Sequence, residues 1–371
     1  MVEYAKYELK NVCSRLSSGK SISSKMISEE GRYPVYGGNG LRGYTDHSNF
    51  SGDCAIIGRQ GAFCGNVRYF SGEAYMTEHA VVVCANNLNN THYLAYLLST
   101  MNLGRLSGQS AQPGLSVKTL GIQEIMLPSI EYQNKVVALL SSLDEKIAVN
   151  NNINDNLYEM VNAYYTSLFK ENDCEMTTVG NYAERIYSGG TPMTSNAAYW
   201  NGTFGWFSSG ETRNRFVIST EKTITQAGID NSSTKLATKY DIVMASAGQG
   251  FTRGQTSMLL IDTYVNQSVI VIKSERNILP YLFWNLANRY DELRAISDSS
   301  SIRGSLTTKM IAAFEIPLAN EQSLQAFADF AWSVIHQIEN NLLENERLTA
   351  LRDSLLPKLM SGEIDVSDIQ L

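Results

Sequence analysis

Mostly apolar residues recur at alternating intervals of four and three along two stretches of the chain, and the two sets of positions are offset by 191 residues. The first set consists of Val136, Leu140, Leu143, Ile147, Asn150, Asn154, Leu157, Val161, Tyr164 and Leu168. The second consists of Phe327, Ala331, Val334, Ile338, Asn341, Asn345, Leu348, Arg352, Leu355 and Leu359. This spacing predicts two long helices, over about residues 131–169 and 320–356, with the second broken or kinked near Pro357.

Each set contains two asparagines at matching positions. A polar residue within an apolar heptad seam lowers stability but fixes register and partner. The two helices are therefore predicted to pair, and an antiparallel arrangement would place Asn150 near Asn345 and Asn154 near Asn341. The alternative is that the helices never meet and that each packs on its own domain.

The repeat extends beyond the helices. The segment Ile125 to Pro128 matches Phe314 to Pro317, and both precede a long helix. Further upstream, residues 53–61 and 241–250 each read as a buried strand that runs into a turn rich in Gly and Gln. The similar spacing indicates an internal duplication in which each copy runs domain, loop, strand, proline, helix.

The elements predicted within the domains are short. Apolar runs bounded by Gly, Asn and Ser predict strands at 53–57, 80–84, 241–245 and 268–273, and amphipathic spacing predicts helices at 91–101 and 279–293. The predicted fold class is α+β, with two similar globular domains joined by two long helices that pair as an antiparallel coiled coil in a pseudo-two-fold repeat. The expected divisions are a first domain at 1–130, a helical spacer at 131–170, a second domain at 171–318, a second spacer at 319–360 and a tail at 361–371.

Composition and charge narrow the function. No apolar run reaches the roughly 20 residues needed to cross a bilayer, so we expect a cytoplasmic protein. The net charge of −7 argues against a broadly basic DNA-binding face. However, residues 1–130 carry +2 and residues 317–371 carry −6. DNA contacts would therefore have to come from local arginines, with the acidic helical part facing away.

Motifs for catalysis are absent from the sequence. The segment Gly38 to Gly43 formally matches GxGxxG but opens no helix, and there is no P-loop, no Pro-Pro pair of an adenine methyltransferase and no GxSxG. The five cysteines contain no CxxC and form no ligand cluster with the four histidines. We expect no catalytic residue, no metal site and no cofactor in this chain.

The remaining candidates are polar and aromatic residues in glycine-rich turns, which suit contacts to base edges and phosphates. In the first domain these are Asn39, Arg42, Tyr44, Arg59, Gln60, Arg68, Arg105 and Gln109. In the second they are Thr191, Tyr199, Trp200, Ser208, Ser209, Arg213, Asn214, Arg215, Gln249, Arg253, Gln255 and Arg303. Each also has an ordinary structural explanation, since such residues form turns, carry solvated charges or fill cores.

The chain resembles the specificity (S) subunits of type I restriction-modification systems. The resemblance rests on LSGQSAQPGLSVKTLGIQEIMLPSIEYQNKVVALLSSLDEKI at 106–147, on the block at 304–365 and on SGGTPMTSNAAYWNGTFGWFSSGE at 188–211, which is similar to the opening of a target-recognition domain. One departure is the polar centre NNNIND at 150–155.

The resemblance implies two target-recognition domains, each reading one half of a bipartite asymmetric DNA site, while the paired helices set the number of unread bases between the halves. It also implies double-stranded DNA, two methyltransferase (M) subunits and motor-nuclease (R) subunits as partners. S-adenosylmethionine, ATP and Mg²⁺ would belong to those partners. The alternative reading is a two-headed, non-catalytic protein-interaction scaffold, and an enzyme is a third.

Overall fold

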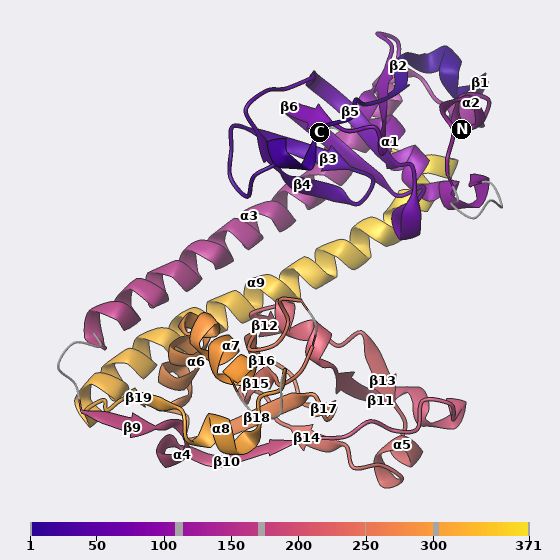
Figure 1. Cartoon of the computed structure of the whole chain (residues 1–371). Helices are drawn as coiled ribbons and strands as arrows, with labels where there is room; N and C mark the ends of the chain where they lie inside the picture. Colours follow the sequence, from indigo (N-terminus) through magenta and orange to yellow (C-terminus); the bar gives the residue numbers. More distant parts are fainter. Residues whose placement is uncertain (1, 108–113, 170–174, 249, 300–303, 370–371) are drawn as a thin grey trace. The chain divides into compact units, whose positions relative to one another are not determined.

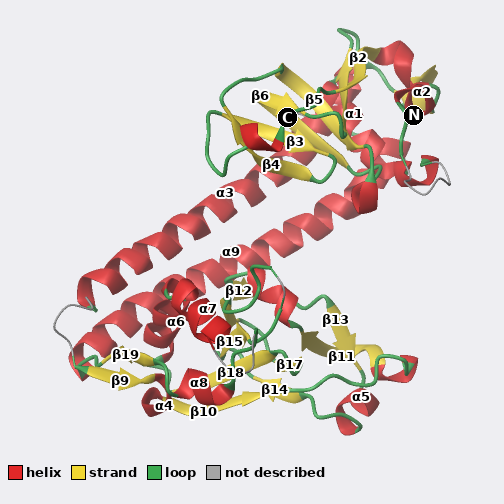
Figure 2. Cartoon of the chain, in the orientation of Figure 1, coloured by secondary structure: helices red, strands yellow, loops and turns green. Residues whose placement is uncertain are grey.

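The computed structural model describes residues 2–107, 114–169, 175–248, 250–299 and 304–369. The chain divides into two compact units (Figure 1). Unit 1 comprises Met1–Ile147 and Arg347–Leu371, and unit 2 comprises Ala148–Glu346. Each unit combines strands with helices (Figure 2), as the predicted α+β class requires.

The main sheet of unit 1 has the strand order β2-β7-β5-β6-β3-β4. Its strands are β2 (Cys13–Ser18), β3 (Tyr33–Gly37), β4 (Gly40–Thr45), β5 (Phe50–Gly58), β6 (Val67–Met76) and β7 (Ala80–Ala85). Neighbouring strands are antiparallel except β3 and β6, which are parallel. A separate antiparallel pair joins β1 (Ala5–Glu8) to β8 (Glu124–Leu127).

Both faces of the centre of this sheet are buried, which explains why residues 54–57 of β5 form an unbroken apolar run. Ala55 and Ile57 face a core that includes helix α1 (Thr91–Thr100), whereas Cys54 and Ile56 face a second cluster. Asn90 caps α1, since its side chain accepts hydrogen bonds from the amides of His92 and Tyr93. The short helix α2 (Val117–Gly121) precedes β8.

Unit 2 contains two sheets, with strand orders β10-β18-β15-β16-β12 and β13-β11-β17-β14. The strands are β10 (Ala183–Ser188), β11 (Trp200–Phe207), β12 (Phe216–Val217), β13 (Lys222–Ile224), β14 (Lys235–Ala237), β15 (Ile242–Ala245), β16 (Thr256–Leu259), β17 (Thr263–Val265) and β18 (Val269–Ser274). The helices within the domain are α4 (Val179–Tyr182), α5 (Gln226–Asp230), α6 (Leu279–Asn288), α7 (Tyr290–Ser299) and α8 (Thr308–Ala312). A further pair joins β9 (Met176–Thr178) to β19 (Glu315–Pro317).

The internal duplication is visible in the topology of the units. The arrangement β2-β7-β5 of unit 1 has its counterpart in β10-β18-β15 of unit 2, and the pair β1·β8 has its counterpart in β9·β19. Helices α1 and α6 follow the equivalent strands β7 and β18. The predicted strands are confirmed as β5, β7, β15 and β18.

The two long helices are α3 (Ile130–Leu168) and α9 (Glu321–Ser361). In unit 2, Asn150 Nδ2 donates to Asn345 Oδ1 over 2.9 Å and Asn341 Nδ2 donates to Asn154 Oδ1 over 2.8 Å. Rising numbers on one helix meet falling numbers on the other, so the pairing is antiparallel. The predicted asparagine contacts are confirmed, and the alternative in which the helices never meet is wrong.

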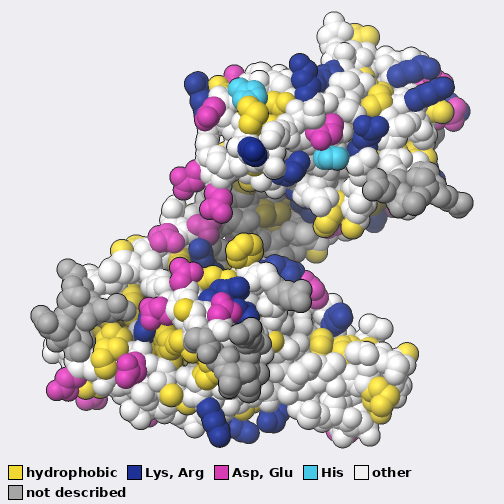
Figure 3. Space-filling view, viewed as in Figure 1, with side chains coloured by type: hydrophobic (Ala, Val, Ile, Leu, Met, Phe, Trp, Pro, Cys, Tyr) yellow, Lys and Arg dark blue, Asp and Glu magenta, His cyan; other side chains and the backbone are white. Residues whose placement is uncertain are grey.

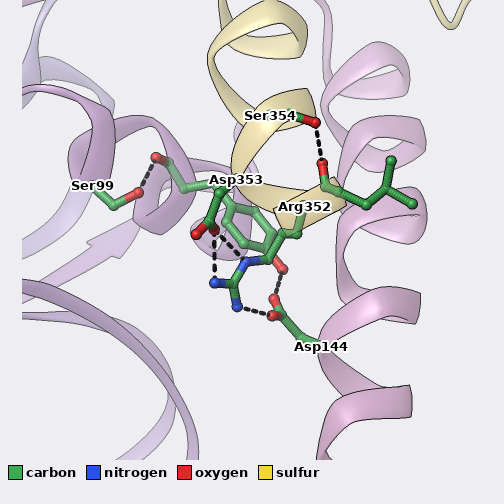
Figure 4. Close-up of polar contacts among 7 residues, drawn as sticks. Ser99, Asp144, Arg352, Asp353 and Ser354 are labelled. Atoms are coloured by element: carbon green, nitrogen blue, oxygen red, sulfur yellow. Dashed lines mark hydrogen bonds and ion pairs between the residues drawn. The ribbon is translucent and has the colours of Figure 1, made fainter. Parts of the chain in front are cut away.

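Several of the predicted seam residues belong to the cores of the units. Leu140 and Leu355 belong to the core of unit 1, while Leu157, Val334 and Ile338 belong to that of unit 2. In unit 1 a polar contact adds to the packing, because Arg352 Nη1 donates to Asp144 Oδ1 over 2.6 Å (Figure 4). The seam predictions Leu143, Ile147 and Leu348 belong to α3 and α9 as well, but lie outside the buried clusters.

The end of the second long helix differs from the expected one. Helix α9 does not end before Pro357 but continues to Ser361, although proline removes the hydrogen bond to the carbonyl of Asp353. Burial of Leu359 and Met360 in the core of unit 1 offsets that loss.

No helix of the described ranges is long and apolar enough to cross a membrane.

The single helix expected at 279–293 is instead two helices, α6 and α7. Arg289 interrupts them with φ −110° and ψ 33°, and its guanidinium lies 4.2 Å from the centre of the Phe314 ring. Leu293 is still fully buried, but it reaches the core from α7. The periodic pattern therefore located the buried residues correctly and missed the break between them.

Candidate nucleic-acid interface

The turn between β3 and β4 brings two arginines of unit 1 together. Gly40 has φ +102°, and a Cβ at this position would lie 2.2 Å from Nη1 of Arg68. A Cβ at Gly37 would lie 2.8 Å from Cδ of Arg42. The glycines thus allow both arginine side chains to lie against the turn, whose tip exposes Asn39.

The turns that follow β5 and β6 meet at the same hairpin. The amide of Arg59 donates to the carbonyl of His79 over 3.0 Å, and His79 Nδ1 lies 3.1 Å from Gln60 Oε1. Gly38 packs on this pair of turns, because a Cβ there would lie 3.1 Å from the His79 carbonyl oxygen. The structure therefore brings together Asn39, Arg42, Arg59, Gln60 and Arg68, which the sequence analysis selected separately. We call these five residues the hairpin cluster.

The hairpin cluster carries little opposing charge. Among the described residues, no carboxylate forms an ion pair with Arg42, Arg59 or Arg68. The nearby Glu78 pairs instead with His79, over 3.4 Å. Lys and Arg side chains are spread over the visible face of unit 1, with Asp and Glu side chains scattered among them (Figure 3). Guanidinium groups without carboxylate partners can bind phosphate oxygens or the acceptor edge of guanine bidentately.

The other candidates of the first domain lie apart from this turn or outside the description. Tyr44 is half-buried on β4, and Arg105 is exposed in the turn after α1. A polar hollow of about 450 Å³ adjoins the cluster, with Asn66, Arg68 and Thr100 among its lining residues. Gln109 lies outside the described residues.

The arginines of unit 2 are held differently, because carboxylates pair with them. Arg213 forms an ion pair with Glu221. Arg215 lies 3.5 Å from Asp155, and its guanidinium stacks 4.2 Å from the centre of the Tyr158 ring. Two hollows of about 560 Å³ and 520 Å³ share Arg213, Arg215 and Tyr158 in their linings. The arginines thus form the wall between two open cavities.

The remaining candidates of unit 2 are dispersed. Asn214 and Gln255 each line one of the two hollows, whereas Ser208 belongs to a capping box with Glu211 in the turn that contains Ser209. Thr191 donates to Gln267, and Trp200 lies beside Trp206 with ring centres 5.0 Å apart and next to Tyr199 in the chain. Arg253 is 7% exposed and pairs with Asp298, which holds it within the domain. Gln249 and Arg303 lie outside the described residues.

Two exposed aromatic residues escaped the sequence analysis. Phe251 is 82% exposed and Phe63 is 43% exposed. Both follow the Gly/Gln turn that ends the equivalent strands β15 and β5. Arg294 and Tyr290 hold the turn at Phe251 by donating to the carbonyls of Gly250 and Phe251 over 2.6 and 2.7 Å. An aromatic residue after the matched Gln-Gly of both repeats was the signal that could have identified them.

The cysteines of the described residues are free thiols. Burial raises the pKa of Cys13 and of Cys54 to about 12, so these thiols stay protonated and inert at neutral pH. Within the described ranges, no group of His, Cys, Asp and Glu has the arrangement of a metal site.

Comparison with known proteins places the chain in a family. The family model for the type I restriction modification DNA specificity domain matches residues 1–159 and again residues 173–349. The chain belongs to this family. The double match agrees with the duplicated topology of the two units.

Individual relatives cover parts of the chain. The EcoprrI specificity subunit of Escherichia coli, a type I restriction enzyme subunit, is 41% identical over 134 residues, which are 35% of this chain and 33% of the relative. The EcoR124I/EcoR124II specificity subunit of Escherichia coli is 25% identical over 263 residues, covering 67% of this chain and 64% of the relative. The chain therefore spans less than two thirds of the length of either relative.

A solved structure shows the same fold along nearly the whole chain. The S subunit of a type I restriction-modification system from M. genitalium matches with a TM-score of 0.63 at 17% identity, covering 96% of each chain.

Proposed function

We propose that this chain is the DNA specificity subunit of a type I restriction-modification complex. The two globular domains each read one half of a bipartite asymmetric site, and the paired helices set the number of unread bases between the halves. The observation that carries the proposal is the duplicated domain followed by a long helix, with the two helices locked in antiparallel register by Asn150, Asn154, Asn341 and Asn345.

Two features of the chain support DNA as the ligand. The hairpin cluster offers arginine, asparagine and glutamine side chains at one glycine-rich turn, the residue types that recognise guanine and adenine edges. The exposed Phe251 and Phe63 add apolar groups that can insert between bases. A protein-interaction scaffold would need neither feature, and the family to which the chain belongs does not favour it.

The length of the helices suits a spacer. Helix α3 has 39 residues and α9 has 41. At about 1.5 Å per residue such a helix extends for about 60 Å. One turn of duplex measures about 34 Å, so helices of this length can hold two reading domains about one duplex turn apart.

Catalysis would be supplied by partners. We propose that two methyltransferase subunits dock on the helical regions and that motor-nuclease subunits join through them, in the cytoplasm. These subunits would carry S-adenosylmethionine, ATP and Mg²⁺. The methyltransferase would also turn the target adenine out of the duplex. The chain itself would supply sequence recognition and no catalytic group.

Selection from random duplexes tests the proposal. The methyltransferase assembled with this chain should enrich a motif of two short fixed halves separated by a constant number of unspecified bases. Enrichment of no split motif would refute the assignment. Replacing residues 188–255 by the corresponding segment of another family member should change the second half-motif only, and a change in both halves would contradict the division of labour.

A further inference from the structure

The four seam asparagines fix the register of the helix pair, but the hydrogen bonds among them distinguish one helix from the other only weakly. Asn150 and Asn154 of α3 are equivalent to Asn341 and Asn345 of α9 at the offset of 191 residues. If α3 paired with the α3 of a second copy, Asn150 would meet Asn154 of that copy and a hydrogen bond between these asparagines could form. The bond from Asn150 to Glu344 could not form, because Ile153 stands at the position equivalent to Glu344. A charged contact in unit 1 adds a further distinction between the possible partners of α3.

The two repeats also differ in a contact between two charged side chains. In unit 1, Tyr96 of α1 donates to Asp144 of α3, and Asp144 accepts from Arg352 of α9 over 2.6 Å (Figure 4). Arg352 also donates to Asp353 over 2.8 Å. Burial lowers the pKa of Arg352, but its hydrogen bonds to these two carboxylates outweigh burial, so that the pKa is raised. We call Tyr96, Asp144 and Arg352 the polar triad.

The equivalent positions of unit 2 are apolar. At the offset of 191 residues, Asp144 corresponds to Ile335 and Arg352 corresponds to Val161. Ile335 and Val161 are both fully buried in the core of unit 2. Aligning the leucines of α1 with those of α6 places Trp284, also fully buried, at the position of Tyr96. One repeat thus uses a charged contact where the other uses three apolar side chains.

Pairing like with like would separate the two charges. Two α3 helices in the same antiparallel register would place each Asp144 against a Val161, and two α9 helices would place each Arg352 against an Ile335. Asp144 and Arg352 would lose each other while still shielded from water, since the side chains of Arg352 and Asp144 are only 28% and 33% exposed. Arg352 would keep Asp353 and Asp144 would keep the Tyr96 hydroxyl. Only α3 with α9 brings the two opposite charges together. We propose that the polar triad selects the partner helix, and that it disfavours assembly with a second copy of this chain through like helices.

Charge reversal in the full-length chain tests this. Asp144→Arg alone opposes two arginines within one chain, and Arg352→Asp alone opposes two aspartates. When these two variants are co-expressed with distinguishable masses, the introduced arginine of one chain can meet the introduced aspartate of the other. Native mass spectrometry should then show a one-to-one heterodimer at least about ten times more abundant than either homodimer. The charge-swapped chain Asp144→Arg/Arg352→Asp should be monomeric, as the proposal also predicts for the wild type.

A second variant keeps the test decisive if the reversed chains fold poorly. Asp144→Ile/Arg352→Val makes the two repeats alike at these positions with residues that unit 2 already buries. This chain should form concentration-dependent homodimers, whereas the control Ser354→Ala, which alters an exposed residue of α9 whose hydroxyl donates to the Leu351 carbonyl, should not. Absence of the heterodimer from a mixture of folded variants, or a strictly monomeric Asp144→Ile/Arg352→Val chain, would overturn the proposal. Either result would mean that the covalent connection, and not the polar triad, chooses the partner.

Discussion

Replacing the arginines of the hairpin cluster should reduce the salt dependence of DNA binding. Arg42, Arg59 and Arg68 lie around one turn without a carboxylate partner among the described residues. Each phosphate contact contributes about 0.9 to the slope of log K against log salt. If all three bind phosphate, the variant Arg42→Gln/Arg59→Gln/Arg68→Gln should lower that slope by about 2.7. At about 0.1 M salt the same term corresponds to a loss of affinity of up to about 500-fold.

The assay is a salt titration of the assembled methyltransferase on its selected duplex and on a random duplex. Loss of a phosphate contact should weaken binding to both duplexes equally, whereas loss of a base contact should weaken binding to the selected duplex only. The matched control is Arg213→Gln/Arg215→Gln, because Glu221 and Asp155 already pair with these arginines and the slope should change less. An unchanged slope for the triple variant, with its unfolding midpoint intact, would refute the assignment of the hairpin cluster to DNA.

Three further predictions concern the seam, the exposed aromatic and pH. Asn345→Leu removes one acceptor of the Asn150 amide, which also donates to Glu344 and belongs to a residue that is 1% exposed. The variant should lower the free energy of unfolding by about 1–3 kcal/mol. Asn150→Leu/Asn345→Leu should recover part of this loss in denaturant titrations, and equal losses in both variants would contradict the role of this hydrogen bond. Phe251→Ala should weaken DNA binding about tenfold. It should not move the unfolding midpoint, because the Phe251 ring is 82% exposed. Unchanged DNA affinity in a filter-binding assay would exclude insertion of this ring between bases. Burial lowers the pKa of His92 from 6.5, and the His92 ring stacks on Tyr69 with ring centres 3.7 Å apart. The unfolded chain therefore binds the proton more readily, and the free energy of unfolding should fall as pH drops through about 6.5. His92→Phe should reduce this decline, and an identical pH profile for both chains would contradict the role of His92.

The long-range organisation was predictable from the sequence because duplication and heptad spacing leave regular traces. The offset of 191 residues and the two asparagines in each seam were enough to predict which residues meet, since an antiparallel pair with internal symmetry has one register that brings the asparagines of one helix against those of the other. The buried strands were found for a similar reason. Their apolar runs face core on both sides, as Cys54 and Ala55 illustrate.

Local geometry was less predictable where packing decides the outcome. Proline statistics end a helix before Pro357, but the burial of Leu359 and Met360 in unit 1 carries the helix onward. At the break between α6 and α7, Arg289 contacts the ring of Phe314, which lies 25 residues further along the chain. No periodic pattern encodes such contacts.

The candidate interface was predictable only as a set of residue types. Sequence could identify arginines beside glycines, but not that Arg42, Arg59 and Arg68 converge while Arg253 is buried against Asp298. That distinction depends on the meeting of three turns around the β3–β4 hairpin. It also depends on which arginines have a carboxylate within reach.

The most direct test of the central claim changes the length of the helix pair. Seven residues in heptad register would be inserted after Ile147 in α3 and a matching seven before Arg347 in α9, at the boundary between the two units. Seven helical residues add about 10 Å, or about three base pairs of duplex. A genome-wide map of methylated sites should then show both half-motifs unchanged and the unread gap lengthened by about three base pairs. An unchanged gap, or altered half-motifs, would contradict the helices as the spacer.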